Sequence, residues 1–314
     1  MADVIKKATR DGYGDGLLAL VDNPNVVVLD ADLAAATKTG VFKKACPERF
    51  FDCGIAEGNM MSIAAGLATT GKTVFASSFA MFAAGRAFEQ VRNSIGYPHL
   101  NVKIGATHGG ISVGEDGATH QCNEDIALMR TIPGMTVINP ADAHEAKLAV
   151  LAAAEMDGPV YLRFGRLAVP VIFGDDYKFE IGKSVRLTEG NDVAIIATGL
   201  MVNEALIAAE QLKGEGIAAR VINMATIKPL DREAVIAAAR ETGAIVTAEE
   251  HSVIGGLGSA VADVVCETLP VPVLRVGVED TFGKSGPAVD LLPIFGLCAE
   301  NIVAKVRAAV ALKK

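Results

Sequence analysis

The stretch THGGISVGEDGATHQ (residues 107–121) follows an apolar run and combines two histidines, two acidic residues and four glycines. Glycine allows positive φ angles and a close approach of the backbone to a ligand. Histidine and acidic side chains carry protons and form hydrogen bonds. A loop of this length is costly to order and adds little to a core. Because long loops in compact domains often bind ligands, this stretch is either a binding loop or a long polar connection between a strand and a helix.

The loop lies within a regular alternation of predicted strands and helices. Short apolar runs, such as residues 25–29 and 102–106, alternate with longer segments whose apolar residues have helical spacing. Strands that are apolar on both faces are typical of a parallel sheet covered by helices. The sequence therefore predicts an α/β protein with two doubly wound, mainly parallel-sheet domains. We expect a first domain at residues 1–175, a linker at 176–190 and a smaller second domain at 191–314.

Three polar residues occupy strand ends in this prediction. Glu57 and His108 each follow a predicted strand, and Arg163 ends another. Ligands of open parallel sheets bind beyond the carboxyl ends of the strands, so we expect these side chains at one edge of the sheet. Residues 2–21 and 79–94 are each predicted to form a single helix that flanks this sheet.

The composition excludes several functional classes. Of the 314 residues, 51% are hydrophobic and 21% are charged, and the net charge is -8. These values argue against disorder and against a nucleic-acid surface. No apolar run approaches the ~18 residues of a membrane-spanning helix, and the first residues lack an apolar signal core. Five cysteines lie far apart without a CxxC pair, which is typical of free thiols in a reducing compartment. We expect a cytoplasmic protein that binds neither nucleic acid nor a membrane.

Four segments together resemble the C-terminal half of a transketolase. They are FDCGIAEGNM (51–60), SFAMF (78–82), GEDGATHQ (114–121) and FGKSGPA (282–288). The resemblance extends from Thr9 to Val303, and GEDGATHQ is its most diagnostic block. It implies the C-terminal subunit of a split transketolase, which contains the pyrimidine-binding domain for thiamine diphosphate and the smaller C-terminal domain.

The resemblance also implies that half of the cofactor site lies on another polypeptide. A full transketolase has a further domain that binds the diphosphate of thiamine diphosphate through Mg2+, and this chain resembles only the other two domains. The triplet Gly14-Asp15-Gly16 matches the start of the family's metal-diphosphate motif. It lies inside a predicted amphipathic helix without the downstream part of the motif, which favours a structural role. We therefore expect no metal ligands here, an N-terminal transketolase subunit as partner, and an α2β2 assembly.

The family's cofactor contacts map onto four residues of this sequence. Glu57 matches the catalytic glutamate that hydrogen-bonds the aminopyrimidine ring and favours its imino tautomer. Without the resemblance, we would interpret Glu57 as a helix-start glutamate stabilised by the helix dipole rather than as a catalytic residue. Phe79 and Phe82 match aromatic residues that flank the aminopyrimidine, although the pair alone is typical of a core. Asp32 matches an acid near the cofactor, or caps a strand end. The family often has a third aromatic residue where Gly85 stands.

The family's substrate contacts map onto five residues. Arg10, His108 and Arg163 match positions that hold the sugar phosphate, and a guanidinium fork suits a phosphate dianion. The alternative for each arginine is a surface ion pair. Asp116 matches the acid that reads the configuration of sugar hydroxyls. His120 matches a histidine near the reacting carbons, where it would bind the donor sugar and transfer protons as a catalytic group.

The resemblance implies a transketolase of the kind found in pentose phosphate metabolism. Such an enzyme transfers a two-carbon ketol unit from a ketose phosphate to an aldose phosphate, and this chain would be active only with its partner. Ala36 stands where the family has a phosphate-binding serine, so the identity of the sugar is open. The alternatives are the β subunit of a 2-oxo acid dehydrogenase E1 component, a fragment of a 1-deoxyxylulose-5-phosphate synthase, and a non-catalytic paralogue that acts as a scaffold. The Thr-His pair at 107–108 and the GEDGATHQ block favour the transketolase.

Overall fold

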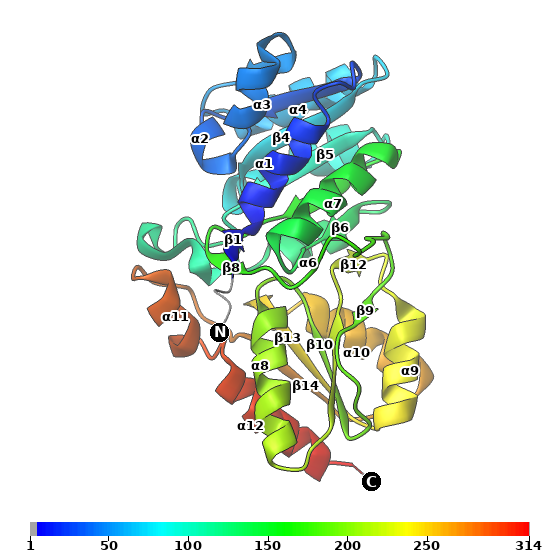
Figure 1. Ribbon diagram of the computed structural model, residues 1–314. Helices are drawn as coiled ribbons and strands as arrows, with labels where there is room; N and C mark the ends of the chain where they lie inside the picture. The colour runs from blue at the N-terminus through cyan, green and yellow to red at the C-terminus, as the bar shows by residue number, and fades with distance from the viewer. Residues whose placement is uncertain (1–4, 314) are drawn as a thin grey trace.

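The computed structural model describes residues 5–313 and consists of two α/β halves that lie end to end (Figure 1). The larger sheet has seven strands in the order β12-β6-β7-β5-β4-β2-β3, and the smaller has five in the order β14-β13-β10-β11-β9. Both sheets are parallel except for one edge strand each, because β12 is antiparallel to β6 and β9 is antiparallel to β11. The predicted fold class is confirmed.

The larger sheet is buried on both faces. Along β2, Val27 and Leu29 belong to one apolar cluster, while Val26 and Val28 belong to another on the opposite face. This alternation explains why the strand reads as a continuous apolar run. The strands of this sheet are β2 (Val26–Asp30), β3 (Phe50–Asp52), β4 (Thr73–Phe79), β5 (Val102–Thr107), β6 (Thr136–Ile138), β7 (Val160–Arg163) and β12 (Thr226–Lys228). The helices are α1 (Thr9–Ala19), α2 (Ala34–Thr37), α3 (Gly40–Ala45), α4 (Glu57–Ala68), α5 (Phe88–Gln90), α6 (Asp125–Arg130) and α7 (Ala143–Glu155), with short turns η1 (Pro47–Arg49) and η4 (Ile111–Asp116).

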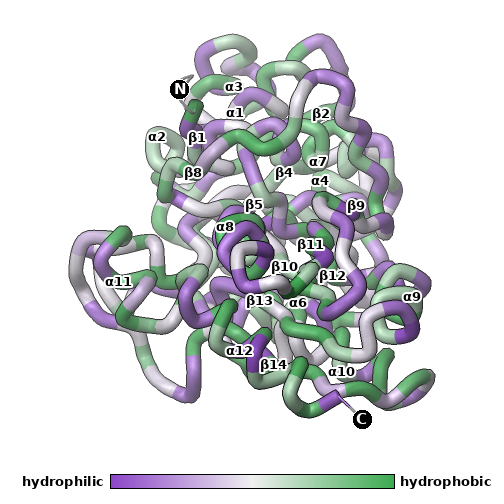
Figure 2. Tube along the Cα trace, turned by 60° about the horizontal axis from the view of Figure 1, so that its bottom comes forward, coloured by the Kyte–Doolittle hydropathy of each residue, from purple (hydrophilic) through white to green (hydrophobic). Residues whose placement is uncertain are grey.

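The smaller sheet follows the same plan. Its strands are β9 (Val185–Arg186), β10 (Val193–Ala197), β11 (Ala219–Asn223), β13 (Ile245–Ser252) and β14 (Val273–Val278). Its helices are α8 (Met201–Gly214), α9 (Arg232–Thr242), α10 (Leu257–Thr268), α11 (Ala288–Ile294) and α12 (Ala299–Ala311). Figure 2 shows hydrophilic and hydrophobic residues mixed along α9, whose buried face includes Val235 and Ala239. Strand β9 lies within the predicted linker. Strand β12 comes after this linker in the sequence but pairs with the larger sheet.

The prediction of a single helix at residues 2–21 is wrong over its first part. Lys6–Ala8 forms strand β1, which pairs antiparallel with β8 (Ala168–Pro170), and the helix begins at Thr9. Residues 2–4 lie outside the described part of the chain. The triplet Gly14-Asp15-Gly16 is inside α1, as predicted. A Cβ atom added at Gly16 would lie 2.6 Å from the Val150 side chain, so this glycine allows α1 to pack closely on α7.

The predicted helix at residues 79–94 is also interrupted. Strand β4 continues through Phe79, and two π-helical turns, η2 (Met81–Arg86) and η3 (Val91–Gly96), flank the short helix α5. Each π turn adds a residue to the helical repeat and changes the direction of the side chains that follow. Apolar spacing alone does not reveal such a turn. Within residues 5–313, the structure contains no helix that combines the length and apolar character needed to cross a bilayer.

Candidate active site

Glu57 lies at the first position of α4, directly beyond the carboxyl edge of the larger sheet. Its side chain is only 1% exposed. The Ser78 hydroxyl donates to Glu57 Oε1 at 3.2 Å, and Arg86 Nη1 donates to Glu57 Oε2 at 2.7 Å. The helix N-terminus also favours a negative charge at this position. The sequence thus places a buried carboxylate at the expected edge, and both of its oxygens have polar partners.

Four aromatic rings gather beside this carboxylate. Phe79, at the end of β4, and Phe82, in η2, have nearly parallel rings with centroids 5.9 Å apart. The His108 ring stacks on Phe79 with a centroid distance of 3.7 Å. The His120 ring meets Phe82 edge-on at 5.3 Å. Phe79 and Phe82 therefore do lie together, but on a strand end and a π turn rather than on one face of a helix.

His108 is buried, and its hydrogen bonds determine its tautomer. Arg10 Nη1 lies 3.1 Å from Nε2, and a guanidinium can only donate, so Nε2 must accept. Nδ1 then carries the proton and faces the Thr107 hydroxyl at 2.9 Å. Burial, followed by the charges of Arg10 and Arg166, lowers the pKa of His108 to about 3. The imidazole is therefore neutral near pH 7, and the positive charge of the predicted phosphate site comes from arginine.

Arg163 has the wrong environment for its predicted role as a phosphate ligand. Its guanidinium is 3% exposed and pairs with buried Asp125 at 2.8 Å. Its remaining bonds go to the backbone carbonyls of Cys122, at 3.2 Å, and Glu250, at 2.9 Å. These partners tie the end of β7 to the second half of the protein. Because the N–H donors of Arg163 already bind groups inside the protein, the site proposed below does not include this residue.

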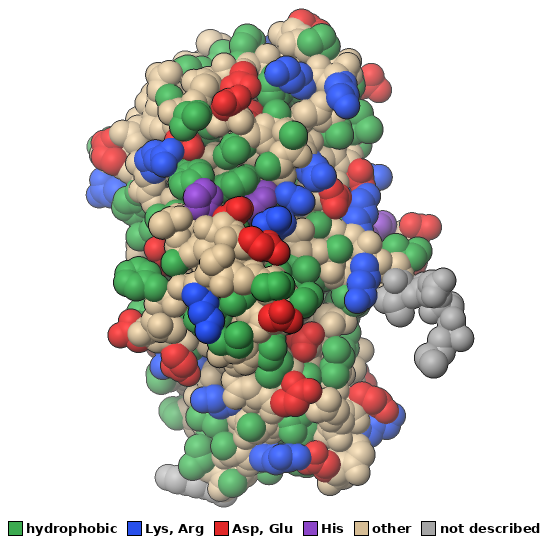
Figure 3. Space-filling model, turned by 90° about the vertical axis from the view of Figure 1, so that its left-hand side faces the viewer, with side chains coloured by type: hydrophobic (Ala, Val, Ile, Leu, Met, Phe, Trp, Pro, Cys, Tyr) green, Lys and Arg blue, Asp and Glu red, His purple; other side chains and the backbone are tan. Residues whose placement is uncertain are grey.

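Arg166, three residues further along, is the cation that sequence reasoning missed. Its side chain is 36% exposed and lies 3.7 Å from Asp116 and 3.5 Å from Glu115. The backbone N–H of Arg10 donates to the carbonyl of Gly165 at 3.4 Å, which places Arg10 beside the segment that carries Arg166. Burial lowers the pKa of Arg10, while the charge of Asp11 raises it and that of Arg166 lowers it. The sequence feature that could have indicated Arg166 is its position as a second arginine shortly beyond the end of β7. Figure 3 shows histidine side chains beside basic and acidic ones near the middle of one face.

The remaining predicted residues lie around this neighbourhood. The Ala36 carbonyl accepts a hydrogen bond from Arg10 Nη1 at 3.1 Å, so the backbone contributes at the position where the family serine is absent. Asp116 is exposed within the glycine-rich loop and can reach solvent or a ligand. The partly exposed His120 has its Nδ1 2.9 Å from the Thr119 hydroxyl.

Asp32 is exposed at the end of β2, with φ of 63°. Its backbone N–H donates to Asp52 Oδ1 at 3.1 Å. The cap of this strand end is the buried Asp30, which accepts from Leu33 N at 2.6 Å and from the Thr37 hydroxyl at 2.7 Å. Burial raises the pKa of Asp30. Asp32 is thus not the capping residue, and its place near the cofactor stays a prediction.

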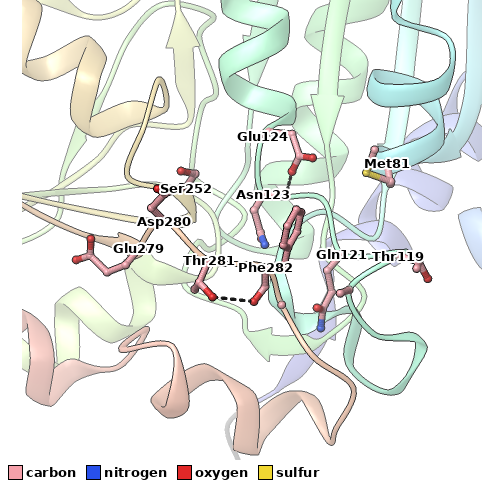
Figure 4. Close-up of a pocket in the computed structure, with 12 residues that line it drawn as sticks. Met81, Thr119, Gln121, Asn123, Glu124, Ser252, Glu279, Asp280, Thr281 and Phe282 are labelled. Carbon is pink, nitrogen blue, oxygen red and sulfur yellow. Dashed lines mark hydrogen bonds between the residues drawn. The ribbon is translucent and has the colours of Figure 1, made fainter.

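A cavity of about 630 Å³ adjoins the aromatic cluster and lies between the two halves (Figure 4). Loop residues of the second half form one wall, and Phe282 in that wall is 88% exposed. The lining residues are Met81, Ala118, Thr119, Gln121, Asn123, Glu124, Ser252, Glu279, Asp280, Thr281, Phe282 and Gly283. Met81 and Thr119 are the direct neighbours of Phe82 and His120 in sequence, so the cavity opens next to the candidate site.

These residues fit one side of an aminopyrimidine site. A buried carboxylate beside an aromatic pair can bind a ring nitrogen while the ring packs on an aromatic face. Within the described residues, no group of three or more His, Cys, Asp or Glu side chains is arranged to hold a metal ion. The location of Mg2+ ligands on a partner stays a prediction.

Comparison with known proteins identifies the family. The pyrimidine binding domain of transketolase matches residues 5–171, and the transketolase C-terminal domain matches residues 182–302. A putative transketolase C-terminal section from Methanocaldococcus jannaschii is 52% identical over 306 residues, which cover 96% of each chain. The 6-deoxy-6-sulfo-D-fructose transketolase subunit SqwH of Clostridium sp. strain MSTE9 is 48% identical over 295 residues, covering 94% of this chain and 92% of that one.

A solved structure described as a split gene transketolase, inactive beta4 tetramer, superimposes with a TM-score of 0.90. It is 56% identical, and the alignment covers 98% of this chain and 99% of that one. Both halves of the fold thus agree with the matched domains and with relatives that align over nearly the whole chain. The chain therefore belongs to the transketolase family, which depends on thiamine diphosphate, and corresponds to the C-terminal subunit of a split transketolase.

Proposed function

We propose that this chain supplies the aminopyrimidine side of the active site of a two-component transketolase. The complete enzyme transfers a two-carbon ketol unit from a ketose phosphate to an aldose phosphate. The observation that carries the proposal is the burial of the Glu57 carboxylate, 1% exposed, which contacts Ser78, the sequence neighbour of Phe79, and Arg86, which lies over the Phe82 ring. A buried carboxylate beside an aromatic face suits a nitrogen heterocycle better than it suits an anionic substrate.

Glu57 and the aromatic pair bind and orient the cofactor ring. Thiamine diphosphate, when bound, supplies the nucleophilic carbon and the electron sink for carbon–carbon cleavage. Glu57 would hold the aminopyrimidine nitrogen through a carboxyl oxygen, and Phe82 and Phe79 would pack against the ring. The aromatic side chains also exclude water, which strengthens the hydrogen bond of the carboxyl group.

The cationic side of the site binds the anionic end of the sugar. Arg10 and Arg166 provide guanidinium groups for this end, and the neutral His108 adds a polar ring that holds Arg10 in place. Asp116 contacts sugar hydroxyls from the exposed loop. His120 moves protons at the reacting carbons through Nε2, while Thr119 contacts Nδ1 and fixes the ring.

The diphosphate and Mg2+ ligands belong, in this proposal, to an N-terminal transketolase subunit in an α2β2 assembly. The names of the similar proteins support a divided enzyme, because they are described as a C-terminal section, a subunit and a split-gene product. The similarity to a 6-deoxy-6-sulfo-D-fructose transketolase subunit also extends the substrate class to sugars with a terminal sulfonate. The five free cysteines agree with a cytoplasmic location.

The test is reconstitution. The chain is purified together with an N-terminal transketolase subunit from the same organism and supplied with thiamine diphosphate and Mg2+. We expect ketol transfer from xylulose 5-phosphate to ribose 5-phosphate, or from a sulfonated ketose, and no turnover by either subunit alone. Glu57→Gln should lower kcat by about a hundredfold or more, as expected for loss of a catalytic proton-transfer group. Glu210→Gln, at a surface position 78% exposed, is the matched control. Wild-type turnover by Glu57→Gln contradicts the proposal.

A further inference from the structure

Arg86 makes two contacts that together resemble those of a planar heterocycle. Its Nη1 donates to Glu57 Oε2 at 2.7 Å, and its guanidinium carbon lies 4.5 Å from the centroid of the Phe82 ring. A guanidinium is flat, rich in N–H donors and suited to stacking on aromatic faces. The Arg86 guanidinium therefore covers a face of the Phe82 ring and binds a carboxylate oxygen of Glu57 at the same time.

We propose that Arg86 competes with the aminopyrimidine ring for Glu57 and Phe82, and that cofactor binding displaces the Arg86 side chain. This inference rests on the proposed function, because it assumes that an aminopyrimidine binds at Glu57. The Ser78 hydroxyl already donates to Oε1 at 3.2 Å, so Oε2 is the oxygen that the ring would contact. The same oxygen accepts from Arg86. When the ring binds, the Glu57 carboxylate takes up a proton from solvent and donates it to the ring nitrogen through Oε2, so this oxygen can no longer accept the Arg86 N–H along the same direction.

The displacement is physically feasible because the two partners differ in burial. The Arg86 side chain is 50% exposed, whereas Glu57 is 1% exposed. Arg86 can therefore swing into solvent and be hydrated, while Glu57 stays in place. A buried carboxylate without a partner is costly, so the ion pair stabilises the subunit before the ring arrives. The consequence is a weaker apparent affinity for the cofactor, because each binding event must break this pair.

The first experiment measures thiamine diphosphate affinity in the reconstituted two-subunit complex by calorimetric titration. Arg86→Met removes the competing group but keeps an unbranched apolar stem over Phe82. We expect its Kd to fall about three- to tenfold, the equivalent of the net contribution of one ordinary hydrogen bond, because hydration of the released Arg86 offsets part of the broken pair. The exposed Arg92, which contacts Asn93, provides the control variant Arg92→Met, and its Kd should equal that of the wild type. A weaker or unchanged affinity of Arg86→Met overturns the inference, because Arg86 would then support the ring or have no effect on it.

A second measurement separates this inference from the proposed function. The isolated chain and its Arg86→Met variant are titrated with 4-amino-2-methylpyrimidine, followed by NMR shifts of amide groups. Tighter binding to Arg86→Met supports the inference even if no subunit pair shows ketol transfer, in which case only the proposed function fails. Ketol transfer by the wild-type pair, combined with an unchanged or weaker affinity of Arg86→Met for thiamine diphosphate, overturns the inference and leaves the proposed function standing.

Discussion

Arg163 and Arg166 lie three residues apart, but changing each to methionine should have different effects. Arg163→Met should lower the stability of the chain, and Arg166→Met should lower its affinity for a phosphorylated sugar. Arg163 is 3% exposed and pairs with Asp125, which is 0% exposed. Loss of one partner of a buried ion pair costs about 3–5 kcal/mol, because it leaves an uncompensated charge. Domains unfold with only ~5–15 kcal/mol, so Arg163→Met should unfold at a much lower urea concentration. Tyr161 still donates to Asp125 at 2.9 Å, which limits the loss.

Arg166→Met should leave stability nearly unchanged. Arg166 is 36% exposed, and its acidic partners Glu115 and Asp116 are 64% and 44% exposed. Exposed ion pairs of this kind contribute only ~0–1 kcal/mol. A charge-assisted hydrogen bond to an anion is worth about 1.5–3 kcal/mol, so KM for a phosphorylated sugar should rise roughly ten- to hundredfold. KM for the same sugar without its phosphate should barely change.

Two assays check this pair of expectations. Urea denaturation of the isolated subunit, followed by circular dichroism, gives the free energy of unfolding of each variant. Steady-state kinetics of the reconstituted complex give KM for sugars with and without the phosphate. The reasoning is refuted if Arg163→Met keeps wild-type stability and loses phosphate affinity, or if Arg166→Met unfolds like Arg163→Met.

Three further changes test the packing and electrostatics of the described residues. Gly12→Ala should destabilise the chain by about 2–4 kcal/mol, because the added Cβ would overlap a backbone carbonyl of α7. A Cβ added at Gly66 has nothing within 4 Å, so Gly66→Ala should stabilise α4 by about 0.5–1 kcal/mol. Thermal unfolding should show a lower melting temperature for the first variant and a higher one for the second. Tyr177→Phe removes the donor that contacts buried Glu145 at 2.6 Å, and urea unfolding should show a loss of about 1–2 kcal/mol. The pKa of His108, about 3 in the folded chain, lies below its unfolded value, so the unfolded chain takes up the proton first and stability falls as pH drops from ~6.5 toward 3. Between pH 7 and 5.5, wild type should lose about 1 kcal/mol more than His108→Asn, and equal losses would contradict this assignment.

Much of the fold could be predicted because its signals are local. The buried residues of α7 (Ala143–Glu155) have the helical spacing by which helices between the strands were predicted, and Asp142 caps the start of this helix. The errors occurred where tertiary contacts override local spacing. Lys6–Ala8 becomes a strand because Ala168–Pro170, far away in sequence, provides its hydrogen-bonding partner. The π turns at Met81–Arg86 and Val91–Gly96 carry no apolar signature of their own.

The candidate site was predictable in part. The strand-end rule and the family resemblance placed Glu57, Phe79, Phe82 and His108 together. In the structure the three rings stack on one another, and Arg86 contacts both Glu57 and the Phe82 ring. Arg163 was predicted to hold the sugar phosphate, with a surface ion pair as the alternative, and the sequence did not show that buried Asp125 and two backbone carbonyls bind its guanidinium. The Arg86–Glu57 pair was invisible for a similar reason, since the residues are 29 positions apart and meet only through a π turn.

The arrangement of charges gives the site a built-in polarity. Arg86 and Glu57 lie on the Phe82 side of the aromatic pair, whereas His108 stacks on Phe79 and holds Arg10. Because His108 is neutral, it can stand between a cation and an aromatic ring without adding repulsion. In the proposed function, an anionic sugar end is attracted toward Arg10, whereas the charge of Glu57 is compensated by Arg86, so this attraction favours one orientation of the bound sugar. Replacing Arg10 by an acidic residue should therefore reduce productive binding of the sugar more than replacing it by a neutral one.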